Sequence, residues 1–172
     1  TKTLAVERST AWLTDVYLCR FDTSEAAVAA ANLAGGGVGC QSLSCPVGYT
    51  LEPTEGRRCY KVYTESKTWD DAREACWADG ADLAVITSDV ENQFVRTLGS
   101  PNKEYWIGVH DKTVEGHWET VEGGIIPYAN WNGGEPNNGG TGEDCGGLRA
   151  DGTWNDGKCT EEFHWVSFAC SF

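Results

Sequence analysis

The sequence predicts an α+β domain in which two helices and several short strands support one long polar loop. Three observations indicate this class. Two segments with N-cap residues, apolar stripes and a terminal glycine are typical of helices. Short apolar runs separated by turn residues are typical of strands. A glycine-rich stretch, residues 131–159, lacks the alternation of a core strand, and so long a loop inside a compact domain is usually functional.

The composition is that of a folded acidic protein. Of the 172 residues 40% are hydrophobic and eight are tryptophan, which argues against a disordered chain. The net charge is −13, from 26 acidic and 13 basic residues. We therefore expect no nucleic acid partner, because phosphate binding needs clustered Lys and Arg. We also expect no membrane insertion, because no apolar stretch approaches about 18 residues.

The cysteines predict disulfides and a secreted, extracellular protein. None forms a CxxC pair, and few histidines are near, so a zinc site is disfavoured. Their spacing alone leaves the pairing open. The chain begins at Thr1 without a methionine or a signal-peptide pattern, and we expect a mature or trimmed product. The eight positions are Cys19, Cys40, Cys45, Cys59, Cys76, Cys145, Cys159 and Cys170.

Residues 1–44 are predicted to form an N-terminal arm apart from a domain at 45–172. An apolar cluster begins at Trp12, and DTSEAAVAAANLAGGG (22–37) favours a short helix capped by Asp22 or Thr23. So short a helix is marginal alone in water, so it should pack on something. Two alternatives stay open, a loosely attached arm or an oligomerisation segment that makes the protein a homo-oligomer.

The first elements of the domain are a hairpin and a helix. CPVGYTLEPTEGRRCYKVY (45–63) predicts two extended pieces around a turn that Cys45 and Cys59 are placed to close. SKTWDDAREACWADGADL (66–83) predicts a helix that Ser66 or Thr68 caps and Gly80 ends. The apolar stripe of this helix is Trp69, Ala72, Ala75 and Cys76.

A second helix and several strands follow. In TSDVENQFVRTLG (87–99), Ser88 and Glu91 match a capping box and Gly99 is the stop. We expect Val90, Phe94, Val95 and Leu98 to form its buried face. YWIGV (105–109) favours a central strand, and HWETV (117–121), residues 145–148 and residues 165–170 favour further strands.

Residues 131–159 carry the candidate site. Amides and carboxylates stand close together in this glycine-rich stretch, and calcium prefers six to eight such oxygens. We expect the side chains of Glu135, Asn137, Glu143, Asn155 and Asp156 to bind one calcium ion.

Nothing in the sequence indicates an enzyme. His110, His117 and His164 stand singly and belong to no catalytic motif. Pairs of carboxylates are also typical of glycosidases, but here the acids alternate with amides, which favours metal binding. We therefore expect no catalytic residues.

Four motifs in order, WIGV (106–109), EPN (135–137), EDC (143–145) and WND (154–156), resemble the C-type lectin carbohydrate-recognition domain over residues 45–170. The resemblance implies two helices flanking small antiparallel sheets with a long calcium-binding loop. It also implies three disulfides, Cys45–Cys59, Cys76–Cys170 and Cys145–Cys159. Cys19 and Cys40 lie outside the match, and either pair with each other or link two chains.

The resemblance further implies how the site works. The calcium held by Glu135, Asn137, Glu143, Asn155 and Asp156 binds two neighbouring sugar hydroxyls directly, and Pro136 is cis. The order EPN implies mannose-type sugars (mannose, N-acetylglucosamine, glucose and fucose), whereas QPD goes with galactose. A second calcium is implied at Asp111, Glu115, Asn138 and Asp144, with Glu143. Asn138 stands where some relatives have Asp, which lowers the charge of that second site.

We therefore expect a secreted, calcium-dependent lectin whose partners are glycans or glycoproteins. The alternative is a lectin-like domain that binds protein, ice or a mineral surface.

Overall fold

The computed structural model describes residues 17–18, 41–42, 45–54, 58–140, 142–161 and 167–172. The chain divides into two compact units, Thr1–Ser44 and Cys45–Phe172. In the first, strand β1 (Tyr17–Leu18) pairs antiparallel with β2 (Gln41–Ser42). The helix predicted within 22–37 and both Cys19 and Cys40 lie outside the described residues, as do residues 165 and 166 of the last predicted strand.

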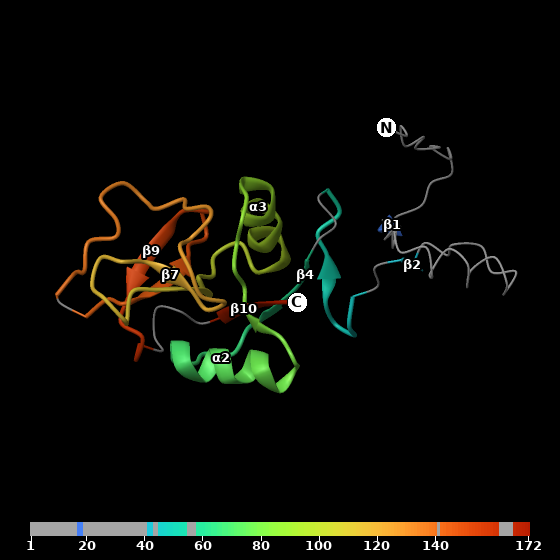
Figure 1. The fold of residues 1–172 in the computed structure, drawn as a ribbon, viewed down its shortest axis with the longest axis horizontal. Helices are drawn as coiled ribbons and strands as arrows, with labels where there is room; N and C mark the ends of the chain where they lie inside the picture. The colour runs from blue at the N-terminus through green and yellow to red at the C-terminus, as the bar shows by residue number, and fades with distance from the viewer. Residues whose placement is uncertain (1–16, 19–40, 43–44, 55–57, 141, 162–166) are drawn as a thin grey trace, which may run out of the picture. The chain divides into compact units, whose positions relative to one another are not determined.

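The described residues of the second unit form two helices and one eight-stranded sheet (Figure 1). The sheet order is β3-β4-β10-β6-β8-β9, with β5 paired to β10 and β7 to β6. The pair β6–β10 is parallel, whereas the other pairs are antiparallel. The α+β class is confirmed, and the parallel pair makes the sheet a mixed one. The strands are β3 (Thr50–Leu51), β4 (Cys59–Tyr63), β5 (Asp82–Leu83), β6 (Tyr105–His110), β7 (Glu119–Thr120), β8 (Cys145–Leu148), β9 (Trp154–Gly157) and β10 (Ser167–Ser171).

Each face of this sheet has its own hydrophobic core. On β6, Trp106 belongs to the core that contains helix α2 (Trp69–Ala78), while Ile107 belongs to the core that contains helix α3 (Asp89–Leu98). Successive side chains of a strand point to opposite faces of its sheet. Strand β6 therefore contributes apolar side chains to the core on each face. Figure 1 shows α2 and α3 on opposite sides of β4 and β10.

Helix α2 forms where the sequence predicts it. The Thr68 side chain accepts a hydrogen bond from the Asp71 N–H, which satisfies one free donor of the first turn. Trp69, Ala72 and Cys76 are buried, and the helix ends at Ala78, before Gly80.

Helix α3 is also confirmed, but its buried face differs from the prediction. Ser88 accepts from the Glu91 N–H as expected, whereas the Glu91 carboxylate accepts from the N–H of Thr87 and not from that of Ser88. Glu91 is 2% exposed and Val90 is 37% exposed. The prediction of a buried Val90 is wrong, because a first-turn residue at that angle points away from the sheet.

Three disulfides tie these elements together, and they are the pairs that the resemblance implied: Cys45–Cys59, Cys76–Cys170 and Cys145–Cys159. Cys76–Cys170 joins α2 to β10, across 94 residues of sequence. Cys145–Cys159 joins β8 to the residues that follow β9, so it closes the segment that carries the WND motif.

Strand β9 was not predicted, and neither were the two-residue strands β1, β2 and β5. Residues 154–157 form β9, which pairs with β8 from Cys145↔Gly157 to Leu148↔Trp154. Its sequence, WNDG, has no alternation or β-branched residue that would indicate a strand, because its outward side chains belong to the candidate site.

Candidate calcium and carbohydrate site

The β8–β9 pair positions two of the predicted ligands. Asn155 and Asp156 lie on β9, directly after Trp154, which is fully buried. The Trp154 ring donates its N–H to the Asn92 amide oxygen at 2.8 Å and meets the Trp131 ring edge to face at 5.6 Å. A buried tryptophan with its N–H satisfied fixes the backbone on which the two polar residues stand.

The EPN segment approaches β9 from the long loop. The Glu135–Pro136 peptide bond is cis, as the resemblance implied. Just beyond it, the Asn138 N–H donates to Asp156 Oδ2 at 2.7 Å. Asn138 Oδ1 accepts from the N–H groups of Gly142 at 2.6 Å and Glu143 at 3.0 Å. Asn138 therefore connects Gly142 and Glu143 of the loop to Asp156 on β9.

Two members of the first predicted set, Asn137 and Glu143, meet at Gly139. A Cβ at this position would lie 2.8 Å from both Asn137 Oδ1 and Glu143 Oε2. These two oxygens therefore face the same small space, which the absence of a side chain keeps open. Burial raises the pKa of Glu135, and the nearby carboxylate of Asp156 raises it further.

The second predicted set lies beside the first. The Asp111 N–H donates to the Asp144 carbonyl at 3.1 Å, and Asp111 Oδ2 accepts from the Gly116 N–H at 2.8 Å. Glu115 is exposed on the same turn and interacts with the Asn138 side chain. Residues more than twenty positions apart in sequence thus meet here.

The electrostatics of both sets favour a cation. Partial loss of solvent around the carboxyl group raises the pKa of Asp111, Glu115, Glu135 and Glu143, and neighbouring carboxylates raise each further. The Asp156 charge contributes to all four shifts, so this residue lies between the two sets. Raised carboxyl pKa values mean that the ionised forms are disfavoured unless positive charge is added.

Unpartnered buried oxygens support the same conclusion. Asp111 and Asp156 are 3% and 1% exposed, yet an oxygen of each, together with one of Glu135, has no hydrogen-bond partner. Buried polar atoms are normally paired, and cations bound at the two predicted sets would satisfy these three. Among the described residues no three Asp, Glu, His or Cys side chains already form a metal cage. The amide oxygens of Asn137 and Asn155 would therefore have to complete the coordination.

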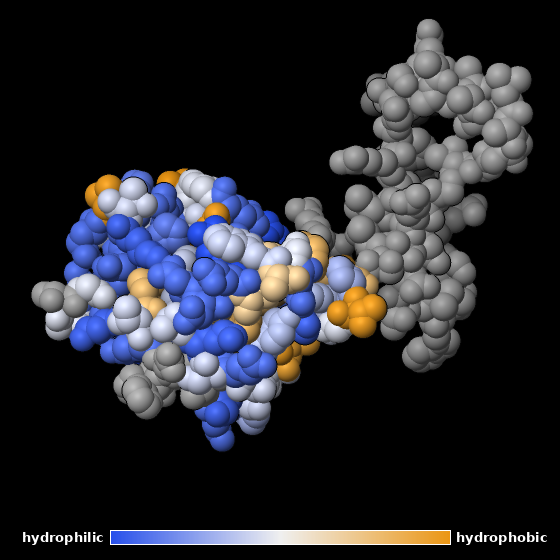
Figure 2. Space-filling view, turned by 90° about the horizontal axis from the view of Figure 1, so that it is seen from below, coloured by the Kyte–Doolittle hydropathy of each residue, from blue (hydrophilic) through white to orange (hydrophobic). Residues whose placement is uncertain are grey.

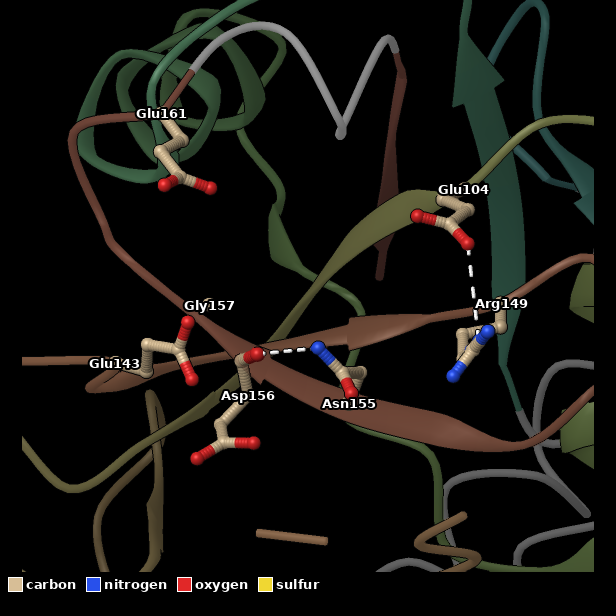
Figure 3. A pocket seen from close by; sticks show the side chains of 7 residues that line it. All are labelled: Glu104, Glu143, Arg149, Asn155, Asp156, Gly157 and Glu161. Atoms are coloured by element: carbon tan, nitrogen blue, oxygen red, sulfur yellow. Dashed lines mark hydrogen bonds and ion pairs between the residues drawn. The ribbon is translucent and has the colours of Figure 1, made fainter. Parts of the chain in front are cut away.

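A cavity of about 320 Å³ adjoins the first set. Its lining includes three residues that the sequence analysis did not identify: Glu104, Arg149 and Glu161. Figure 3 shows Glu143, Asp156 and Asn155 between Glu161 on one side and the Arg149–Glu104 ion pair on the other. No sequence motif marks these three residues, because they reach the cavity from separate segments.

Comparisons with known proteins agree with this geometry. The protein-family model described as "Lectin C-type domain" matches residues 65–171. The human protein "C-type lectin domain family 17, member A" is 35% identical over 153 residues, which cover 88% of this chain and 38% of that protein. The chain thus spans less than half the length of this relative.

Solved structures give the same result. The cow CD23 C-type carbohydrate-recognition domain, determined in the presence of a GlcNAc2Man3 oligosaccharide, has a TM-score of 0.66 and 30% identity, over 75% of this chain and 95% of that one. A calcium-independent type II antifreeze protein has a TM-score of 0.68 and 28% identity, over 77% and 96%. Because the family model matches more than half of this chain, the chain belongs to the C-type lectin domain family.

Proposed function

We propose that this protein is a secreted, calcium-dependent lectin that binds terminal mannose-type sugars, among them mannose, N-acetylglucosamine and fucose. The observation that carries the proposal is the meeting of the EPN segment with Asp156 around unpartnered buried oxygens. The family consists of lectins, which bind carbohydrate without transforming it. The sugar class, the metal and the secretion are the proposed part.

The side chains of the site would each act on the sugar in a defined way. Bound calcium would supply direct coordination of two neighbouring hydroxyls. The carboxylates of Glu135 and Glu143 accept hydrogen bonds from those hydroxyls, whereas the amides of Asn137 and Asn155 donate to them. Each hydroxyl is then held by a donor and an acceptor in fixed positions, and this geometry selects the hydroxyl arrangement.

Two observations support the mannose class. The acceptor Glu135 precedes the cis proline and the donor Asn137 follows it, the order that goes with equatorial hydroxyl pairs. The cow CD23 domain, which shares the fold, was solved in the presence of a mannose-containing oligosaccharide.

The first experiment is retention on immobilised mannose with saturating calcium and again with excess EDTA. We expect retention only with calcium, and retention that survives EDTA would contradict the proposal. The double variant E135Q/N137D exchanges donor and acceptor without changing side-chain size. It should lose most of its mannose binding, roughly tenfold if one hydrogen bond per hydroxyl is lost, and gain binding to galactose.

Multivalency is a further part of the proposal. One shallow site for two hydroxyls should have a dissociation constant on the order of millimolar, so useful avidity requires several copies. We propose that residues 1–44 assemble the chain into a homo-oligomer that binds glycoproteins. Sedimentation of the full chain and of a chain that starts near Gly39 tests this. An unchanged oligomeric mass would show that residues 1–44 do not mediate assembly.

The alternative function is binding of protein, ice or a mineral surface without sugar. It is favoured by one observation, the similarity to a calcium-independent type II antifreeze protein. On the face shown in Figure 2, hydrophilic residues predominate and strongly apolar ones form separate spots, whereas apolar interaction surfaces are usually contiguous. A glycan array with and without calcium separates the two functions, because only the lectin binds in a calcium-dependent way.

A further inference from the structure

The cavity beside the metal set extends past the residues that would hold calcium. Glu143, Asn155 and Asp156 form one part of its lining, and Glu104, Arg149 and Glu161 form the rest, together with Gly157. Asp156 is 1% exposed and has an oxygen without a partner. The cavity is therefore continuous with the place where a metal-bound sugar would lie.

The charges of this cavity are unequal. Four carboxylates line it, those of Glu104, Glu143, Asp156 and Glu161, against the single guanidinium of Arg149. Arg149 is already paired, since its Nε lies 3.8 Å from Glu104 Oε1. The cation of the proposed site would neutralise Glu143 and Asp156. The carboxylate of Glu161 then remains as surplus negative charge.

Neighbouring charge outside the cavity does not reverse this balance. A lysine outside the lining, Lys158, lies near Glu143, as Glu161 does. Lys158 is not among the residues that line the cavity. A ligand group that enters the cavity therefore meets Glu161 and the Arg149–Glu104 pair, and not an unpaired cation.

We propose that this cavity is a subsite for a sugar that carries an ammonium group, such as 2-amino-2-deoxyglucose, and that it disfavours anionic sugars. This inference rests on the proposed calcium-dependent binding of neighbouring hydroxyls. In 2-amino-2-deoxyglucose the amino group is on the carbon next to the 3-hydroxyl. With the 3- and 4-hydroxyls at the metal, the ammonium group lies one carbon away from it and can enter the cavity.

The chemistry of the lining suits this ligand better than its acetylated form. An ammonium group donates three hydrogen bonds and is attracted to a carboxylate. N-acetylation removes the charge and adds volume to the group that would face Glu161. A carboxylate or sulfate on the ligand would instead be repelled by Glu161.

The test is competition for immobilised mannose at saturating calcium and neutral pH, with glucosamine, N-acetylglucosamine and mannose as inhibitors. We expect glucosamine to inhibit about fivefold better than N-acetylglucosamine, the size of one partly screened charge pair. The preference should shrink as salt is added. E161Q should remove most of it, and E161K should reverse it while mannose inhibits as before.

A matched control is E74Q, which removes one exposed carboxylate from α2, outside the cavity lining. This variant should keep the full preference. Equal inhibition by the amino and N-acetyl sugars, in a protein that binds mannose, would overturn this inference but not the proposed function. Loss of calcium-dependent mannose binding in the unaltered protein would instead overturn the proposed function.

Discussion

The sheet and the long loop of the same domain are held in place by different interactions. Ile107 and Trp106 of β6 are fully buried, each in the core of one face of the sheet. In the loop, by contrast, residues 133, 134, 136 and 137 are exposed, and Gly134 and Gly140 have φ values of 96° and 68°. None of the described residues between 132 and 144 belongs to either core, and several carboxylates of the loop repel one another.

This difference indicates two sources of order. Burial of apolar surface stabilises the sheet whether or not an ion is present. The loop depends on hydrogen bonds made by Asn138 and, in the proposed function, on a cation that neutralises its carboxylates. Perturbing the ion and the core separately tests this difference.

The largest effect is expected for Asp156→Asn, because the Asp156 charge acts on both predicted ligand sets. Calcium affinity should fall more than about tenfold, and binding to mannose should disappear at calcium concentrations that saturate the unaltered protein. Calorimetric titration with calcium measures this. Asp70→Asn, on the exposed side of α2, is the control and should leave calcium affinity unchanged.

Removal of calcium should have the next largest effect, and it should be local. Excess EDTA should raise amide hydrogen exchange in residues 132–144, whereas β6 and β10 keep their protection. Exchange that increases equally in the loop and the sheet would show that the two regions unfold together and would contradict the separation.

Ile107→Val should change the sheet and not the loop. It deletes one methylene from a fully buried side chain and should lower the free energy of unfolding by about 1 kcal/mol. Ile107 belongs to a hydrophobic core and is not a predicted ligand. Urea denaturation with and without calcium should therefore show the same decrease in the free energy of unfolding. A decrease that appears only with calcium would link this core to the metal site.

The smallest effect concerns pH. Burial and neighbouring carboxylates raise the pKa of Asp111 and Glu135 in the metal-free fold. Such groups bind more protons when folded, so their contribution makes the metal-free domain more stable as the pH falls from the raised pKa toward the unfolded one. With saturating calcium the same acidification should destabilise, because protons compete with the ion.

Thermal melting at several pH values checks these opposite slopes. Asp111→Asn should reduce the metal-free gain in acid. Parallel slopes with and without calcium would mean that the raised carboxyl groups do not bind the ion.

Much of the framework was predictable because its signals are local. Thr68 and Ser88 cap their helices as predicted, and the apolar run at 105–109 is the central strand. The exposed Val90 and the buried Glu91 were not predicted. The residues of the first turn of α3 do not by themselves indicate which side of the helix will face the sheet. The short strand β9 was missed because its side chains serve the site and give no strand pattern.

The sequence by itself determined the identity of the helices, the central strand and the motifs that indicate calcium and sugar, because caps, apolar runs and motif spacing are properties of adjacent residues. Only the tertiary structure decided that Asp156 lies between two ligand sets and that Glu104, Arg149 and Glu161 share a cavity. These residues come from separate segments, and no local pattern fixes the distance between side chains that only the folded sheet brings together.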